Sequence, residues 1–248
     1  MIEKPLGGPK SGALDVDEDG CDELLTGYNL VDHDGTLLWT IPIENATAEH
    51  ADHILSADLN GDGRLELAYS GSKDFFVATL DGEILWRRPH THSQKSVAGR
   101  FREDVDGLTL ILTEKWIGIT CYTPDGEALW SQPIVGDAFH RVSGWGTDGL
   151  DLVTFEPKLE VPYEEVPFES SPGQTRDLWP YLMDGEGNRA VEFPWKEDYV
   201  QRAQHIRSYR GYDHGIGFRV QLVDLNGDGV DEIVVWDRNR VLAFGPPA

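Results

Sequence analysis

Three nearly identical acidic segments carry the clearest chemistry in the sequence. They read Asp15-Val-Asp-Glu-Asp-Gly-Cys-Asp-Glu23, Asp58-Leu-Asn-Gly-Asp-Gly-Arg-Leu-Glu66 and Asp224-Leu-Asn-Gly-Asp-Gly-Val-Asp-Glu232. The shared pattern offers side-chain oxygens at its first, third, fifth and ninth positions and a backbone carbonyl at the seventh, while Gly at the sixth permits a sharp turn. Oxygen ligands on a flexible loop are typical of Ca²⁺ sites, and carboxylates this close together repel one another without a cation. The pattern therefore predicts about three bound Ca²⁺ ions.

Each acidic segment supplies four side-chain ligands to its predicted Ca²⁺ ion. The ligands are Asp15, Asp17, Asp19 and Glu23 in the first segment, Asp58, Asn60, Asp62 and Glu66 in the second, and Asp224, Asn226, Asp228 and Glu232 in the third. We expect a structural role, in which each ion ties the turn between the first two strands of a repeat. A catalytic role for the ions and an acidic turn without metal are the alternatives.

Basic residues and histidines form a second pattern, upstream of the acidic segments. The residues five positions before each segment, counted from Arg100 and Trp145 in two degenerate repeats, are Lys10, His53, Lys95, His140 and Arg219. More polar residues cluster around them, namely His50, Asp52, His90, His92, Gln94, Arg141, His205, Arg207, Tyr209 and Arg210. In a chain of net charge −23, this cluster favours a site for an acidic ligand. The alternatives are local hydrogen bonding at the starts of strands and a transition-metal site built from several histidines.

Short strands must position these residues. The chain reads as short apolar runs, such as 66–70, 109–113 and 232–236, separated by Gly, Asp and Asn. A second repeated element is an Asp-Gly turn followed by a Leu-Trp pair, whose tryptophans we expect to pack neighbouring repeats together: Trp39, Trp86 and Trp130. Repeats of about 40–45 residues with four short strands are typical of propeller blades. The predicted fold is an all-β propeller of about five four-stranded blades.

The repeats divide one predicted domain, residues 1–248, into five units. Their bounds are about 1–46, 47–90, 91–134, 135–200 and 201–248, and the fourth unit carries a long predicted insertion at about 156–200. The last unit has no Leu-Trp strand. Either residues 1–9 complete that blade and close the ring, or the chain is part of a larger propeller. An open β-solenoid is the alternative fold.

Composition excludes several functional classes. The chain has 248 residues, with 44 Asp and Glu against 21 Lys and Arg. This balance disfavours nucleic acid, because phosphate binding needs a basic surface. No apolar run approaches the roughly 18–20 residues that cross a membrane, so membrane insertion is not expected. The two cysteines, Cys21 and Cys121, rule out a disulfide framework, and no signal peptide is visible at the start of the sequence.

The acidic loop, within a repeat of this length, resembles the FG-GAP type of calcium-binding propeller repeat. Three segments also look like the propeller of rhamnogalacturonan lyases: His50-Ala-Asp-His53 leading into the second acidic segment, the run 97–108, and the closing unit 224–235. The resemblance implies β-elimination at a uronic acid in a polysaccharide, by a calcium-bound protein that is secreted or periplasmic. Those lyases have eight blades and are much longer, so only the calcium ligands carry over residue by residue.

β-Elimination needs a cation for the uronate carboxylate, a base for the C5 proton and an acid for the leaving oxygen. The predicted catalytic residues are Lys95, Arg141, Arg207 and Arg210 for the carboxylate, and His53, His92, His140, His205 or Tyr209 for proton transfer. The expected partner is an acidic polysaccharide or oligosaccharide. The alternatives are a non-catalytic carbohydrate-binding or adhesion propeller, and a fragment that needs a partner chain or missing blades.

Overall fold

The described part of the chain is built from β-strands. The computed structural model describes residues 11–43, 50–115, 117–134, 136–146, 149–157, 180–193, 219–236 and 241–246. These residues form five separate antiparallel sheets, four of them with four strands and the fifth with three. The predicted all-β class is therefore confirmed. Within the described ranges, no helix has the length and apolar character needed to cross a membrane.

The strands follow the chain order within every sheet. Sheet 1 contains β1 (Ser11–Leu14), β2 (Glu23–Thr26), β3 (Asn29–Val31) and β4 (Leu37–Thr40). Sheet 2 contains β5 (Ala51–Ala57), β6 (Glu66–Gly71), β7 (Asp74–Thr79) and β8 (Ile84–Pro89). Sheet 3 contains β9 (Ser93–Gly99), β10 (Thr109–Glu114), β11 (Gly118–Tyr122) and β12 (Ala128–Gln132). Sheet 4 contains β13 (Gly136–Val142), β14 (Leu152–Pro157), β15 (Tyr181–Met183) and β16 (Arg189–Glu192), and sheet 5 contains β17 (Arg219–Val223), β18 (Glu232–Trp236) and β19 (Val241–Phe244).

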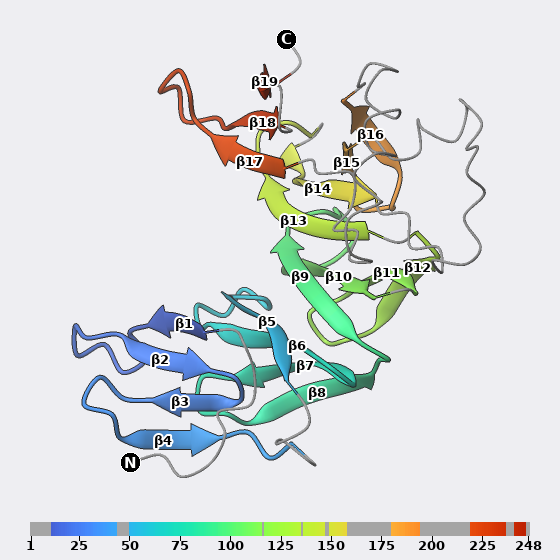
Figure 1. Cartoon of the computed structure of the whole chain (residues 1–248). Helices are drawn as coiled ribbons and strands as arrows, with labels where there is room; N and C mark the ends of the chain where they lie inside the picture. Colours follow the sequence, from blue (N-terminus) through green and yellow to red (C-terminus); the bar gives the residue numbers. More distant parts are fainter. Residues whose placement is uncertain are drawn as a thin grey trace, which may run out of the picture.

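The five sheets are arranged as blades along an open arc (Figure 1). The first strands lie on the inner side of the arc, where β5 contacts β9, β9 contacts β13, and β13 contacts β17. The last strands of sheets 1 to 4 lie on the outer side. Sheets 1 and 5 stand at opposite ends, so the described sheets do not close into a ring.

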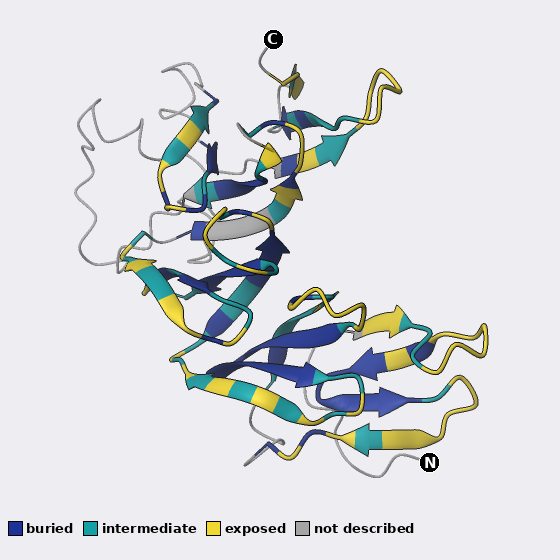
Figure 2. Ribbon diagram, turned by 180° about the vertical axis from the view of Figure 1, so that it is seen from behind, coloured by how far each residue is buried: buried dark blue, intermediate teal, exposed yellow. Residues whose placement is uncertain are grey.

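Apolar cores lie between successive sheets, which explains the continuous apolar runs in the sequence. The central strands of sheets 2 and 3 are buried on both faces (Figure 2). On β7, Phe76 joins the core shared with sheet 1, whereas its neighbour Phe75 joins the core shared with sheet 3. Side chains that alternate between two covered faces need apolar residues at every position rather than at every second one.

The repeated tryptophans join each sheet to the next, as the sequence predicted. The indole nitrogens of Trp39, Trp86 and Trp130 donate hydrogen bonds to the carbonyls of Leu80, Pro124 and Gly185, at 2.9, 2.6 and 2.8 Å. Each acceptor belongs to the Asp-Gly turn of the following sheet. This contact recurs at three successive junctions, so one Trp per blade fixes how neighbouring blades meet.

The predicted insertion is shorter than the sequence suggested. Residues 180–193, which were predicted to lie inside it, instead supply β15 and β16 of sheet 4. The turn between these strands is closed by Asp184, whose Oδ1 accepts hydrogen bonds from the backbone N–H groups of Glu186 and Asn188. The many prolines around this turn concealed its strand pattern. The parts at 158–179 and 194–200 lie outside the described residues.

Candidate active site and cation-binding loops

The three acidic segments form loops of one shared design. They connect the first and second strands of sheets 1, 2 and 5. The carboxylate at the first position accepts a hydrogen bond from the N–H at the sixth position, Gly20, Gly63 or Gly229, at 3.0 Å in all three loops. The closing Glu accepts one from the N–H at the second position, Val16, Leu59 or Leu225, at 2.6 to 2.8 Å. The first and ninth ligand positions therefore make the same backbone hydrogen bonds in all three loops.

The first loop differs from the other two at its third position. Asn60 and Asn226 donate hydrogen bonds to Oε1 of the closing Glu in their loops, at 3.4 and 2.9 Å. Asp17 replaces them in the first loop and, as a carboxylate, has no proton to donate. Oε1 of Glu23 is consequently buried without a hydrogen-bond partner among the described residues.

These loops have the donor set that a hard divalent cation requires. In the first loop, carboxylate oxygens of Asp15, Asp17 and Asp19 lie within 4.8 Å of one another. In the second loop, burial and the nearby charges of Asp62 and Asp58 raise the pKa of Glu66, although hydrogen bonds from the backbone oppose this. Crowded carboxylates of this kind fit Ca²⁺, which takes oxygen ligands in flexible loops. Calcium binding stays a prediction.

A separate polar cluster lies where β5 and β9 begin, and one oxygen of Asp52 is its centre. This Oδ2 lies 3.3 Å from Nε2 of His50, 2.9 Å from Nε2 of His92 and 3.0 Å from the side-chain amide of Gln94. The rings of His50 and His92 meet edge to face, with centroids 5.3 Å apart. We call these four residues the Asp52 cluster.

Register shifts in the strand pairing occur at the positions of these polar side chains. The pairing of β5 with β6 shifts register between Ala51 and His53, which places Asp52 at the irregularity. The pairing of β9 with β10 shifts opposite Gln94, and that of β13 with β14 shifts around His140. An extra residue bends a strand and turns its side chain away from the regular alternation, and such bulges are common beside functional sites. Three inner strands are thus irregular where their polar side chains lie.

A partly buried network around His90, two residues before His92, lies beside the cluster. His90 Nδ1 lies 2.8 Å from Oε2 of Glu114, and its Nε2 lies 2.7 Å from the hydroxyl of Tyr122. Burial raises the pKa of Glu114, but the hydrogen bonds from His90 and the backbone of Thr91 outweigh it and lower that pKa overall. A charged carboxylate therefore anchors the segment that carries His92.

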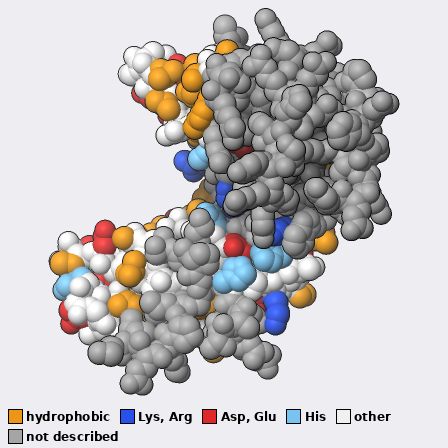
Figure 3. Space-filling model, in the orientation of Figure 1, with side chains coloured by type: hydrophobic (Ala, Val, Ile, Leu, Met, Phe, Trp, Pro, Cys, Tyr) orange, Lys and Arg blue, Asp and Glu red, His pale blue; other side chains and the backbone are white. Residues whose placement is uncertain are grey.

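The polar residues continue along the inner strands. Nδ1 of His53 lies 3.5 Å from the hydroxyl of Ser96. Burial lowers the pKa of His140, a hydrogen bond with the Val220 backbone partly opposes this, and the positive charge of Lys95 lowers it further. Lys95 and His140 are therefore electrostatic neighbours, and the lowered pKa favours the neutral form of the His140 ring. Figure 3 shows histidine and Lys or Arg side chains along the hollowed side of the arc.

The structure places several of the predicted catalytic residues on neighbouring inner strands. His53, His92, Lys95, His140 and Arg141 lie on the inner strands β5, β9 and β13 or just before them, and Nε of Arg141 lies 3.8 Å from Oδ2 of Asp151. His205, Arg207, Tyr209, Arg210 and Lys10 fall outside the described residues. Sequence reasoning missed Glu114, Tyr122 and Ser96, because only strand pairing places them beside histidines.

Comparison with known proteins identifies the fold. No protein-family model matches the chain, and no curated protein does. Rhamnogalacturonan lyase PL11 of Bacillus licheniformis is 16% identical over 97% of this chain and 36% of its own, with a TM-score of 0.56. The exotype rhamnogalacturonan lyase YesX is 15% identical over 97% of this chain and 37% of its own, with a TM-score of 0.52. A lectin from Agrocybe aegerita that recognises terminal N-acetylglucosamine reaches a TM-score of 0.48 at 13% identity, over 94% of this chain and 61% of its own.

These similarities concern the fold. The chain spans about a third of the length of the two lyases, 36% and 37%. The alignments cover 97% of this chain, so its fold is similar to one part of each lyase. The described chain is therefore an all-β assembly of antiparallel sheets whose fold is similar to part of these two rhamnogalacturonan lyases.

Proposed function

We propose that this protein is a polysaccharide lyase that cleaves uronic-acid-containing chains by β-elimination. The observation that carries the proposal is the Asp52 cluster, which joins two histidines to one carboxylate at the starts of the inner strands β5 and β9. The shared fold with two rhamnogalacturonan lyases supports the same reaction class. A secreted or periplasmic location is part of the proposal, because polysaccharides of this kind are extracellular.

Proton abstraction is assigned to His92. Asp52 accepts the Nε2 proton of His92, which places the acceptor lone pair of the neutral ring on Nδ1 and stabilises the imidazolium that forms. His50 and Gln94 hold the same carboxylate oxygen and keep it oriented. His53 and His140, on neighbouring inner strands, are the candidates for protonating the leaving oxygen.

Neutralisation of the substrate carboxylate is assigned to Lys95. Lys95 belongs to β9, which lies between β5, the strand of Asp52, and β13, the strand of His140. Its positive charge therefore lies among the polar residues of the three inner strands. A positive charge beside the uronate stabilises the enolate-like charge that develops when the C5 proton leaves. Arg141 has no part in this proposal, because its ion pair is with Asp151.

We also propose that the three acidic loops each hold one Ca²⁺ ion with a structural role. The shared hydrogen-bond frame and the buried Oε1 of Glu23 support this assignment. The loops lie at the far ends of the first strands from the Asp52 cluster, which adjoins the starts of β5 and β9. Bound calcium would supply charge neutralisation and rigidity to the loops, while the residues of the cluster do the proton transfer.

The test is elimination activity on a panel of uronic-acid polysaccharides, followed by ultraviolet absorbance of the unsaturated product. We expect the native chain to be active in calcium. Asp52→Asn and His92→Ala should each lower kcat by about 100-fold or more, the usual contribution of general acid–base catalysis. Asp81→Asn, the same change in an exposed outer turn, should retain native activity.

The outcomes separate the parts of the proposal. A flat trace from folded native protein on every polysaccharide would overturn the lyase function. Binding of the same polysaccharides, measured by calorimetry, would then support the carbohydrate-binding alternative. If both Asp52→Asn and His92→Ala keep full activity, the protein is still a lyase, but the Asp52 cluster is not its active site.

A further inference from the structure

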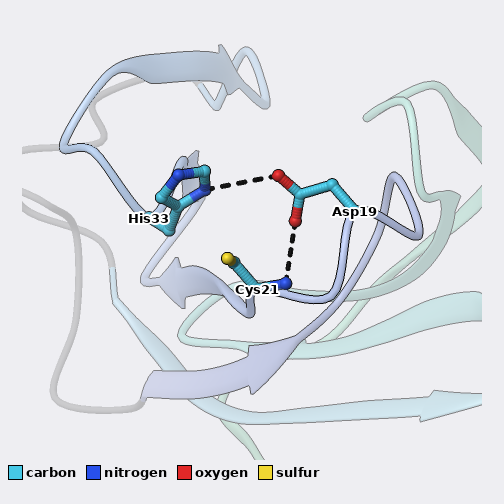
Figure 4. A group of neighbouring side chains, drawn as sticks. All are labelled: Asp19, Cys21 and His33. Carbon is cyan, nitrogen blue, oxygen red and sulfur yellow. Dashed lines mark hydrogen bonds and ion pairs between the residues drawn. The ribbon is translucent and has the colours of Figure 1, made fainter.

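Sheet 1 carries a set of side chains that the other acidic loops do not have. Asp19 and Cys21 belong to the loop between β1 and β2, and His33 belongs to the turn between β3 and β4 (Figure 4). One ligand atom from each of the three lies within 4.8 Å of the others. Nδ1 of His33 is 3.7 Å from Oδ2 of Asp19. Arg64 and Val230 occupy the position of Cys21 in the other two loops.

A second group of ligand atoms shares the same histidine. Glu23, Asp32 and His33 also place one ligand atom each within 4.8 Å of one another. Nδ1 of His33 lies 2.8 Å from Oδ1 of Asp32. Glu23 is only 1% exposed, and its Oε1 is the buried oxygen that has no hydrogen-bond partner among the described residues. A buried carboxylate oxygen without a hydrogen-bond partner indicates a cation near it, and this is the same oxygen that supports the proposed calcium ion of the first loop.

The chemistry of the first group differs from that of the calcium loops. A thiolate, an imidazole and a carboxylate are ligands that Zn²⁺ prefers, whereas Ca²⁺ takes oxygen alone. We propose that Asp19, Cys21 and His33 form a Zn²⁺ site on sheet 1. Binding displaces the thiol proton of Cys21, which is released to solvent.

The Zn²⁺ site and the first calcium loop share Asp19, so they are linked. Asp19 is the fifth-position ligand of the predicted calcium loop. A carboxylate that turns its Oδ2 towards His33 is less available to the loop interior, so each metal weakens the binding of the other. This linkage rests on the proposed calcium role of the loop, whereas the Zn²⁺ site itself does not.

Cobalt provides a spectroscopic test, because Co²⁺ occupies Zn²⁺ sites and its bond to a thiolate absorbs in the near ultraviolet. Co²⁺ is titrated into reduced, metal-free full chain, and Zn²⁺ is then added in competition. We expect thiolate charge-transfer absorption together with the visible bands of tetrahedral Co²⁺, both displaced by Zn²⁺. Cys21→Ser should abolish the charge-transfer absorption.

Substitutions of two proposed ligands are compared with a matched change in the second acidic loop. Asp19→Asn and His33→Ala should weaken Zn²⁺ binding by about tenfold or more, since loss of even an outer-shell partner commonly costs 10–100-fold. Asp62→Asn, the equivalent change in the second loop, should keep native Zn²⁺ affinity. The proposal is overturned if no charge-transfer absorption appears, if it persists in Cys21→Ser, or if Asp62→Asn weakens Zn²⁺ as much as Asp19→Asn does.

Discussion

Glu18 adopts a backbone conformation that the other acidic loops assign to Gly. Its φ angle is 62°, and the matching residues Gly61 and Gly227 have φ angles of 78° and 79°. A side chain at positive φ brings its β-carbon too close to the backbone, at a cost of roughly 1–2 kcal/mol. Glu18 is exposed and is not a predicted calcium ligand, and no side-chain hydrogen bond to another described residue offsets this strain.

Replacing Glu18 with Gly should therefore stabilise the protein. We expect Glu18→Gly to raise the free energy of unfolding by up to about 1 kcal/mol, because relief of strain exceeds the entropy that Gly adds to the unfolded chain. Denaturant unfolding in excess calcium measures the change. Glu83→Gly, an exposed glutamate without positive φ, should instead lower stability. A loss of stability in Glu18→Gly equal to that in Glu83→Gly would show that the strain is absent.

Residues close together in the sequence could be assigned to one site, whereas residues brought together by strand pairing could not. The acidic pattern was enough to predict three similar loops, because all ligands of a loop lie within nine consecutive residues. His90, in contrast, meets Glu114 and Tyr122 across separations of 24 and 32 residues. No local spacing encodes such contacts, since they depend on which strands pair and in what register.

At the scale of elements, strands and turns were predictable but their irregularities were not. Apolar runs bounded by Gly and Asp marked strands such as β6, β10 and β18. The register shift at Asp52, which forms the centre of the candidate site, depends on how β5 pairs with β6. The strands β15 and β16 were missed because they are short and lie among prolines.

Replacing the glycine of an Asp-Gly turn should destabilise the protein where that turn packs against the Trp of the preceding sheet. Gly126 has a φ angle of 79°, and a β-carbon there would lie 2.5 Å from the ring of Trp86. Gly126→Ala should therefore cost about 2 kcal/mol or more, from backbone strain and a clash with a packed indole. Gly12→Ala, whose β-carbon would meet nothing within 4 Å, should leave stability nearly unchanged. Equal thermal midpoints for the two variants would contradict the described junction.

At the scale of the whole molecule, the sheets are connected in a row. Each core cluster joins two successive sheets, and each repeated Trp reaches only the following sheet. Among the described residues, sheets 1 and 5 thus have one packed neighbour, while the sheets between them have two. Two of the three acidic loops belong to these end sheets.

A row of units coupled only to nearest neighbours loses order from its ends. Hydrogen exchange in calcium should therefore show slower exchange for amides such as Ile111 of sheet 3 than for Leu25 of sheet 1 or Ile233 of sheet 5. Chelation should accelerate exchange first in the two end sheets, and sheet 3 should respond last. Simultaneous acceleration in all five sheets would instead describe a single cooperative unit. If the proposed calcium ions bind, they set how many blades belong to the cooperatively folded part, and the acidic loops of sheets 1 and 5 keep these sheets from fraying.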